Sequence, residues 1–143
     1  RLTKIDETTP DFAGDYEWSL SVSYNGDGNV STLQFGFTTG PAIAPKVTVT
    51  GYDKKPTPYR PIPNYRFFMN KYHWNNPDVE ALITALSVNN PTGYTVETPL
   101  GSGNCTMTYT YNEQGYPASR VVTEKSGSTT KIKNQTFSYS CKE

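Results

Sequence analysis

The sequence has few of the residues on which catalytic and nucleic-acid-binding sites depend. It holds one histidine and two cysteines among 143 residues, and its 13 basic residues balance 13 acidic ones. A neutral chain with no basic cluster argues against nucleic acid as a partner, because that contact needs an excess of lysine and arginine. No apolar run approaches the roughly 18 residues that a membrane-spanning helix requires.

The single histidine, His73, offers little support for a catalytic centre. It lies in the segment NKYHWNNPD, beside Trp74. A serine or cysteine nucleophile would need this histidine as its general base, and the G-x-S-x-G turn of many hydrolases does not occur in the chain. We therefore interpret His73 as a packing or loop residue, and we assign no catalytic residue and no cofactor.

Tyrosine, glycine and proline are abundant, with 11 of each. Tyrosine, threonine and valine suit a half-buried pleated sheet, whereas glycine and proline favour turns over long helices. We predict one all-β domain over residues 1–143, mainly an antiparallel meander, curled or barrel-like, with one short helix. The domain is expected to lack an N-terminal strand together with an export and linker segment.

Alternation of apolar and polar residues marks the expected strands. It runs through residues 16–24 (YEWSLSVSY), 46–52 (KVTVTGY) and 105–111 (CTMTYTY), and a period of two predicts strands with one buried face. A further strand is expected over residues 136–141 (TFSYSC). The polar link before it, residues 125–135, has the composition of a turn.

One segment has the pattern of a helix. Asn76, Pro77 and Asp78 form a typical helix start, since asparagine caps and proline fits the first turn. The apolar residues that follow share a single helical face at positions i, i+3, i+4 and i+7: Val79, Leu82, Ile83 and Leu86. The pair Asn90-Pro91 is expected to end this helix.

The stretch YNGDGN, residues 24–29, allows two interpretations. As a calcium loop it would use Asn25, Asp27 and Asn29, but such loops need glycine at the sixth position and glutamate at the twelfth. Val30 and Gly36 stand there instead. An Asp-Gly pair between alternating strands is a strong hairpin signal, so we predict a turn without a metal ion.

The same pattern returns 87 residues later as YNEQGY, residues 111–116. Together with YNGDGNVSTL, YNEQGYPASRV and the half-unit RLTKI at residues 1–5, it resembles the YD-repeat-like hairpin domains of uncharacterised secreted lipoproteins from Bacteroides-type bacteria. The resemblance covers residues 1–37 and 104–143. In both turns asparagine replaces the usual aspartate.

The resemblance implies an exported domain in the periplasm or at the outer-membrane surface. A lipid anchor outside this sequence would provide its only membrane contact. These domains have no assigned activity, so the resemblance supplies no functional residue.

Aromatic residues gather in the middle of the chain, at Tyr59, Tyr65, Tyr72 and Trp74. If exposed, these rings could stack on sugars or on a protein partner. If buried, they fill the core beneath a proline-rich loop, and this interpretation is favoured because large exposed apolar patches are uncommon.

The two cysteines, Cys105 and Cys141, could face each other from neighbouring strands. In an exported protein a disulfide between them would close a loop of about 35 residues, worth about 3 kcal/mol in the loop-entropy model. The alternative is a pair of buried thiols. The Cα separation decides between them.

These observations favour a non-enzymatic binding or structural module whose partner is a glycan or a protein. One alternative is a carbohydrate-binding module that uses the aromatic stretch. The other is a carbohydrate-active hydrolase with paired carboxylates, drawn from the acids near the N-terminus: Asp6, Glu7, Asp11, Asp15 and Glu17.

Overall fold

The computed structural model describes residues 1, 3–11, 14–37, 44–58 and 79–139. Within these ranges the chain forms one eight-stranded antiparallel sheet, in which each strand pairs with the next in the sequence. The strands are β1 (Lys4–Asp11), β2 (Gly14–Tyr24), β3 (Val30–Phe37), β4 (Lys46–Pro56), β5 (Asn89–Thr98), β6 (Gly101–Tyr111), β7 (Pro117–Ser126) and β8 (Thr129–Thr136). The helix is α1 (Val79–Leu86). The predicted meander with one short helix is confirmed.

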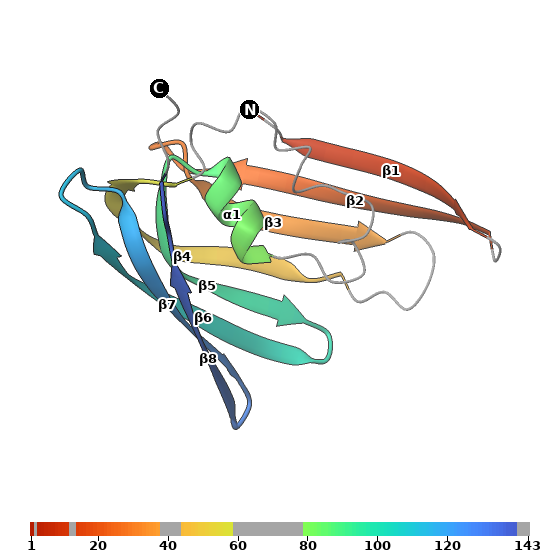
Figure 1. Ribbon diagram of the computed structural model, residues 1–143. Helices are drawn as coiled ribbons and strands as arrows, with labels where there is room; N and C mark the ends of the chain where they lie inside the picture. Colours follow the sequence, from red (N-terminus) through yellow and green to blue (C-terminus); the bar gives the residue numbers. More distant parts are fainter. Residues whose placement is uncertain (2, 12–13, 38–43, 59–78, 140–143) are drawn as a thin grey trace.

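The sheet is curled rather than closed, and β1 and β8 stand at the two ends of the strand order. Figure 1 shows that the strand direction rotates from β1 to β8, as the right-handed twist of strands requires, and that α1 lies over one face. We call the face that contacts α1 the inner face and the opposite face the outer face.

The helix packs through the apolar face that the sequence predicts. Leu82 is 5% exposed and Ile83 is fully buried, while Val79 and Leu86 pack against the same core. Burial of a leucine or isoleucine side chain contributes about 1.5–3 kcal/mol. An eight-residue helix is too short to be stable alone, so these contacts hold α1 on the sheet.

The two Tyr-Asn-x-x-Gly motifs form the same turn, which confirms the hairpin prediction. Asn25 accepts a bond from the backbone N–H of Gly28 at 3.1 Å, and Asn112 accepts one from Gly115 at 2.9 Å. Both glycines have positive φ, 87° and 81°, a conformation that costs glycine little. A β-bulge precedes each turn, at Ser23/Tyr24 and Thr110/Tyr111.

The polar link near the C-terminus was predicted wrongly. Residues 125–135 are not a turn, because β7 continues to Ser126 and β8 begins at Thr129. The expected strand over 136–141 is also wrong in its described part, where only Thr136 is in a strand. All of β8 is exposed, so it lacks the apolar alternation that reveals a half-buried strand.

One smaller expectation also needs correction. Asn90 and Pro91 do not simply end the helix, since both lie in β5. The acids considered for a hydrolase, which fall between residues 6 and 17, lie in β1 and β2. Asp6 is exposed and forms an ion pair with Lys4 at 2.8 Å.

Candidate functional groove

Pairing of the last four strands lines up side chains across the inner face. The register places Tyr94, Cys105, Glu124 and Lys131 in one cross-strand row. The next row toward the strand ends contains smaller residues: Val96, Gly103, Ser126 and Thr129. Side chains that share a row on one face are direct neighbours, so the first row is bulky and the second is shallow.

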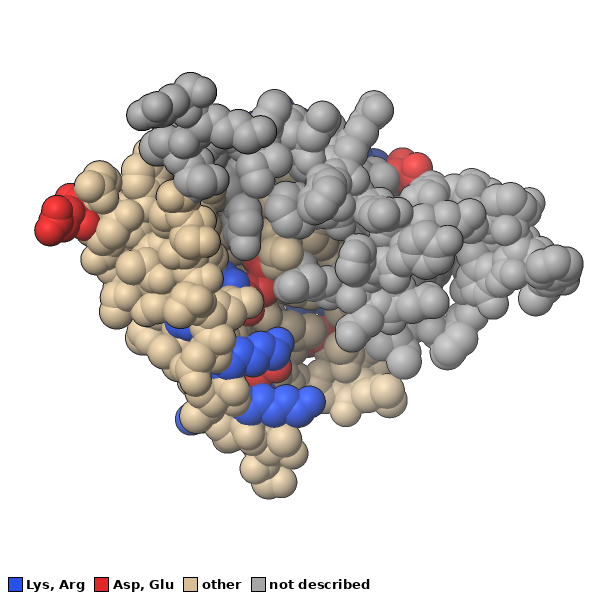
Figure 2. Space-filling view, in the orientation of Figure 1, with Lys and Arg blue, Asp and Glu red and all other residues tan. Residues whose placement is uncertain are grey.

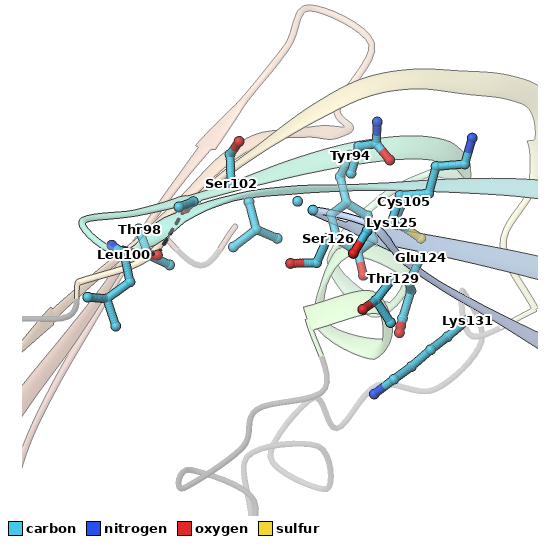
Figure 3. A pocket seen from close by; sticks show the side chains of 16 residues that line it. Tyr94, Thr98, Leu100, Ser102, Cys105, Glu124, Lys125, Ser126, Thr129 and Lys131 are labelled. Carbon is cyan, nitrogen blue, oxygen red and sulfur yellow. Dashed lines mark hydrogen bonds between the residues drawn. The ribbon is translucent and has the colours of Figure 1, made fainter.

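Both rows line an open groove of about 1000 Å³. It is bordered by the β5–β6 turn at Leu100 and the β7–β8 turn at Gly127 and Ser128. Figure 3 shows Glu124, Thr129 and Lys131 on the same side of the strands. Gly103 lies in the floor, where an added Cβ would come within 3.1 Å of the Lys125 carbonyl oxygen. A larger residue at position 103 would therefore crowd the backbone of β7 and reduce the depth of the groove.

Hydroxyl groups predominate among the polar groups of the lining, which includes Thr98, Ser126, Ser128 and Thr129. Glu124 is the single carboxylate among the described lining residues. Its Oε1 accepts a bond from Lys133 Nζ at 2.8 Å. The groove therefore offers many weak hydrogen-bonding groups and one acid that is already paired.

Cys105 lies at the inner end of the groove and is only 3% exposed. Burial raises the pKa of its thiol to about 11, and the charges of Glu80 and Glu124 add to this effect. Burial likewise raises the pKa of Tyr94. A thiol with this pKa carries little thiolate at neutral pH, so it is a poor nucleophile.

Beyond the groove, a buried ion pair connects α1 to the inner face of the sheet. Glu80 on α1 contacts Arg120 on β7, and the two side chains are 8% and 4% exposed. The Arg120 guanidinium also donates to Gln135 and lies over the rings of Tyr109 and Phe137, at 5.9 and 5.6 Å from their centroids. No sequence pattern indicated this cluster.

A second polar cluster joins β4, β5 and β6. The Asp53 carboxylate accepts bonds from the Tyr111 hydroxyl, from the Lys55 backbone N–H at 2.8 Å and from the Asn90 backbone N–H at 3.3 Å. Burial and the Asp53 contact raise the pKa of Tyr111. Because these donors occupy the carboxylate, we interpret the cluster as a structural link between strands.

The oxygens proposed for a calcium loop bind backbone amides instead. Asn25 Oδ1 accepts from the N–H groups of Asp27 and Asn29 at 3.1 and 2.9 Å. Asn29 Oδ1 accepts from Val88 and Asn89 at 2.9 and 2.8 Å. These bonds support the turn interpretation. Within the ranges that the structure describes, no three His, Cys, Asp or Glu side chains converge on a metal-sized site.

The structure leaves the other predicted site residues untested. Tyr59, Tyr65, Tyr72 and Trp74 lie outside the described residues, and so does His73. Cys141 also lies outside them, so its disulfide with Cys105 stays a prediction. The groove itself went unpredicted because β8, which forms one wall, was missed.

Comparison with known proteins adds little. No family model and no curated protein matches the chain. A porin-like protein from Bacteroides uniformis matches structurally with a TM-score of 0.37 and 16% identity, over 89% of this chain and 60% of the other. The chain thus spans less than two thirds of that structure. Separately, none of the described helices has the length and apolar character to cross a membrane.

Proposed function

We propose that this chain is a non-enzymatic binding module whose inner-face groove binds an oligosaccharide. The observation that supports it best is the open groove of about 1000 Å³. A volume of this size falls at the upper end of ligand-binding pockets. The hydroxyl groups of Ser126, Ser128 and Thr129 border it, and such groups both donate to and accept from sugar hydroxyls.

Hydrolysis of a glycan by this groove would need a second acid. Glycoside hydrolases use two carboxyl groups about 5–10 Å apart, whereas the described lining contains Glu124 alone. We therefore expect glycans to be bound and released unchanged.

The proposed location rests on the YD-repeat-like resemblance alone. We infer that the protein is exported and held in the periplasm or at the outer-membrane surface by a lipid anchor outside this sequence. Cell fractionation with surface proteolysis would test this part. Recovery of the native protein in the cytoplasmic fraction would refute it without affecting the groove.

A glycan array followed by calorimetry would test the groove. Ser126→Trp should fill the groove and weaken binding of any glycan hit at least tenfold. Thr106→Trp is the matched control, because Thr106 is exposed on the outer face of β6. Equal affinity in the two variants would place the glycan elsewhere. Release of reducing sugar, lost in Glu124→Gln, would establish an enzyme instead.

A further inference from the structure

The exposed side chains of the edge strand β8 favour some pairing strands over others. β8 stands at the end of the strand order, and all eight of its residues are exposed. In an edge strand the backbone N–H and C=O groups of alternate residues point away from the sheet and can accept another strand. No other described strand pairs with β8 beyond β7. Within the described part of the chain, β8 is therefore open to β-strand addition, a common mode of peptide recognition.

The inner-face side chains of β8 include two lysines, Lys131 and Lys133, at alternate positions. Lys133 Nζ forms an ion pair with Glu124 Oε1 at 2.8 Å, and the Lys133 side chain is 54% exposed. Among the described side chains, one carboxylate lies beside the two ammonium groups, which gives this part of the edge a surplus of one positive charge. Figure 2 shows basic side chains next to acidic ones over this part of the molecule.

Between the lysines, Ile132 projects from the outer face and is 64% exposed. The outer-face residue Val121 on β7 is 38% exposed, and the register places it diagonally from Ile132. The edge therefore offers cations on one face and an apolar side chain on the other. A strand laid beside it would meet both features in alternation, since successive side chains point to opposite faces.

A second copy of this chain fits the edge poorly. In an antiparallel pair centred on Ile132, Lys131 of each copy would stand opposite Lys133 of the other. Like charges directly opposite destabilise a strand pair, and inward-facing lysines on an edge strand commonly prevent self-association. The same charges favour a strand that carries carboxylates at those positions.

We propose that β8 binds an extended acidic segment of a partner protein, added as a ninth, antiparallel strand. The segment would carry Glu or Asp at alternate positions opposite Lys131 and Lys133, with a β-branched residue between them over Ile132. This proposal does not depend on a glycan in the groove, because the added strand would pair with the free edge of β8 and not with the groove floor, although Lys131 also lines the groove.

The test uses the peptide Thr-Thr-Glu-Val-Glu-Thr-Thr, blocked at both ends, titrated into the whole chain and followed by amide chemical shifts. We expect shift changes concentrated in β8 and at least tenfold tighter binding than for the matched peptide with lysine at both glutamate positions. The preference should shrink in high salt. Equal affinities for the two peptides would overturn the proposal.

Two further measurements separate strand addition from simple charge attraction. The variant Lys131→Glu, checked for an unchanged fold by its amide spectrum, should reverse the peptide preference. A peptide with N-methylated alternate amides on its pairing edge should lose binding. If the methylated peptide binds as tightly as the parent, or if sedimentation shows a dimer that Ile132→Pro abolishes, the proposal is wrong.

Discussion

Glu80 on α1 and Arg120 on β7 form an ion pair in which neither side chain is more than a tenth exposed. When the two Tyr-Asn-x-x-Gly motifs are aligned, Arg120 corresponds to Leu33 in the first hairpin, and Leu33 is fully buried. The two hairpins thus share their turn but differ in what they bury. A charge in the second hairpin meets an oppositely charged helix residue where the first hairpin has a hydrocarbon side chain.

Removing either partner of this pair should destabilise the fold strongly. Loss of one partner leaves the other buried charge without its ion-pair partner, which costs about 3–5 kcal/mol. We expect this fall in the free energy of unfolding for Glu80→Leu and for Arg120→Leu, measured by urea denaturation. The double variant should lose much less than the sum. Additive losses would show that the two side chains act independently.

A second prediction compares equivalent positions after the two turns. Asn29 is 2% exposed and its Oδ1 accepts bonds from the backbone of Val88 and Asn89. Asn29→Ala leaves these donors without a partner, at about 1–3 kcal/mol for a buried group. The equivalent Tyr116 is 42% exposed, so Tyr116→Ala should cost less. Equal losses in thermal unfolding would contradict this assignment.

The sequence predicted the elements that have one buried face and one exposed face. The hairpins around Asn25 and Asn112 and the helical face at Leu82 and Ile83 were all predicted, because burial of one face imposes a period of two or 3.6. The turns were predicted because glycine with positive φ and a capping asparagine are local features.

The missed features depend on contacts between distant residues. β8 is held by its ladder with β7 and has no buried face, so its sequence resembles a polar link. The groove arises only when Gly103, Ser126 and Thr129 are brought into one row by strand pairing. Likewise, Glu80 and Arg120 are far apart in the sequence, and neither lies in a motif.

A third prediction concerns alkaline pH. Burial raises the pKa of Cys105 to about 11 and that of Tyr109 to about 12, from ordinary values of 9.0 and 10.0. The folded state therefore keeps these protons where the unfolded state has lost them. Stability should be unaffected by these groups below about pH 9 and should fall as the pH rises toward 12.

Urea denaturation across this pH range measures the effect. The variant Tyr109→Phe removes one of the titrating groups, so its stability should fall less steeply above pH 10 than that of the parent chain. The comparison concerns the slope, because loss of the bond from the Tyr109 hydroxyl to the Pro91 carbonyl oxygen lowers stability at every pH. Parallel curves for the two proteins would exclude Tyr109 as a source of the pH dependence.

The proposal that the inner-face groove binds sugars is tested most directly by amide chemical-shift mapping during titration with a glycan selected on an array. We predict that the shifts concentrate at Gly103, Ser126 and Thr129, saturate with one site, and disappear in Ser126→Trp. Saturable shifts confined to the outer face, or shifts that Ser126→Trp leaves unchanged, would contradict the proposal.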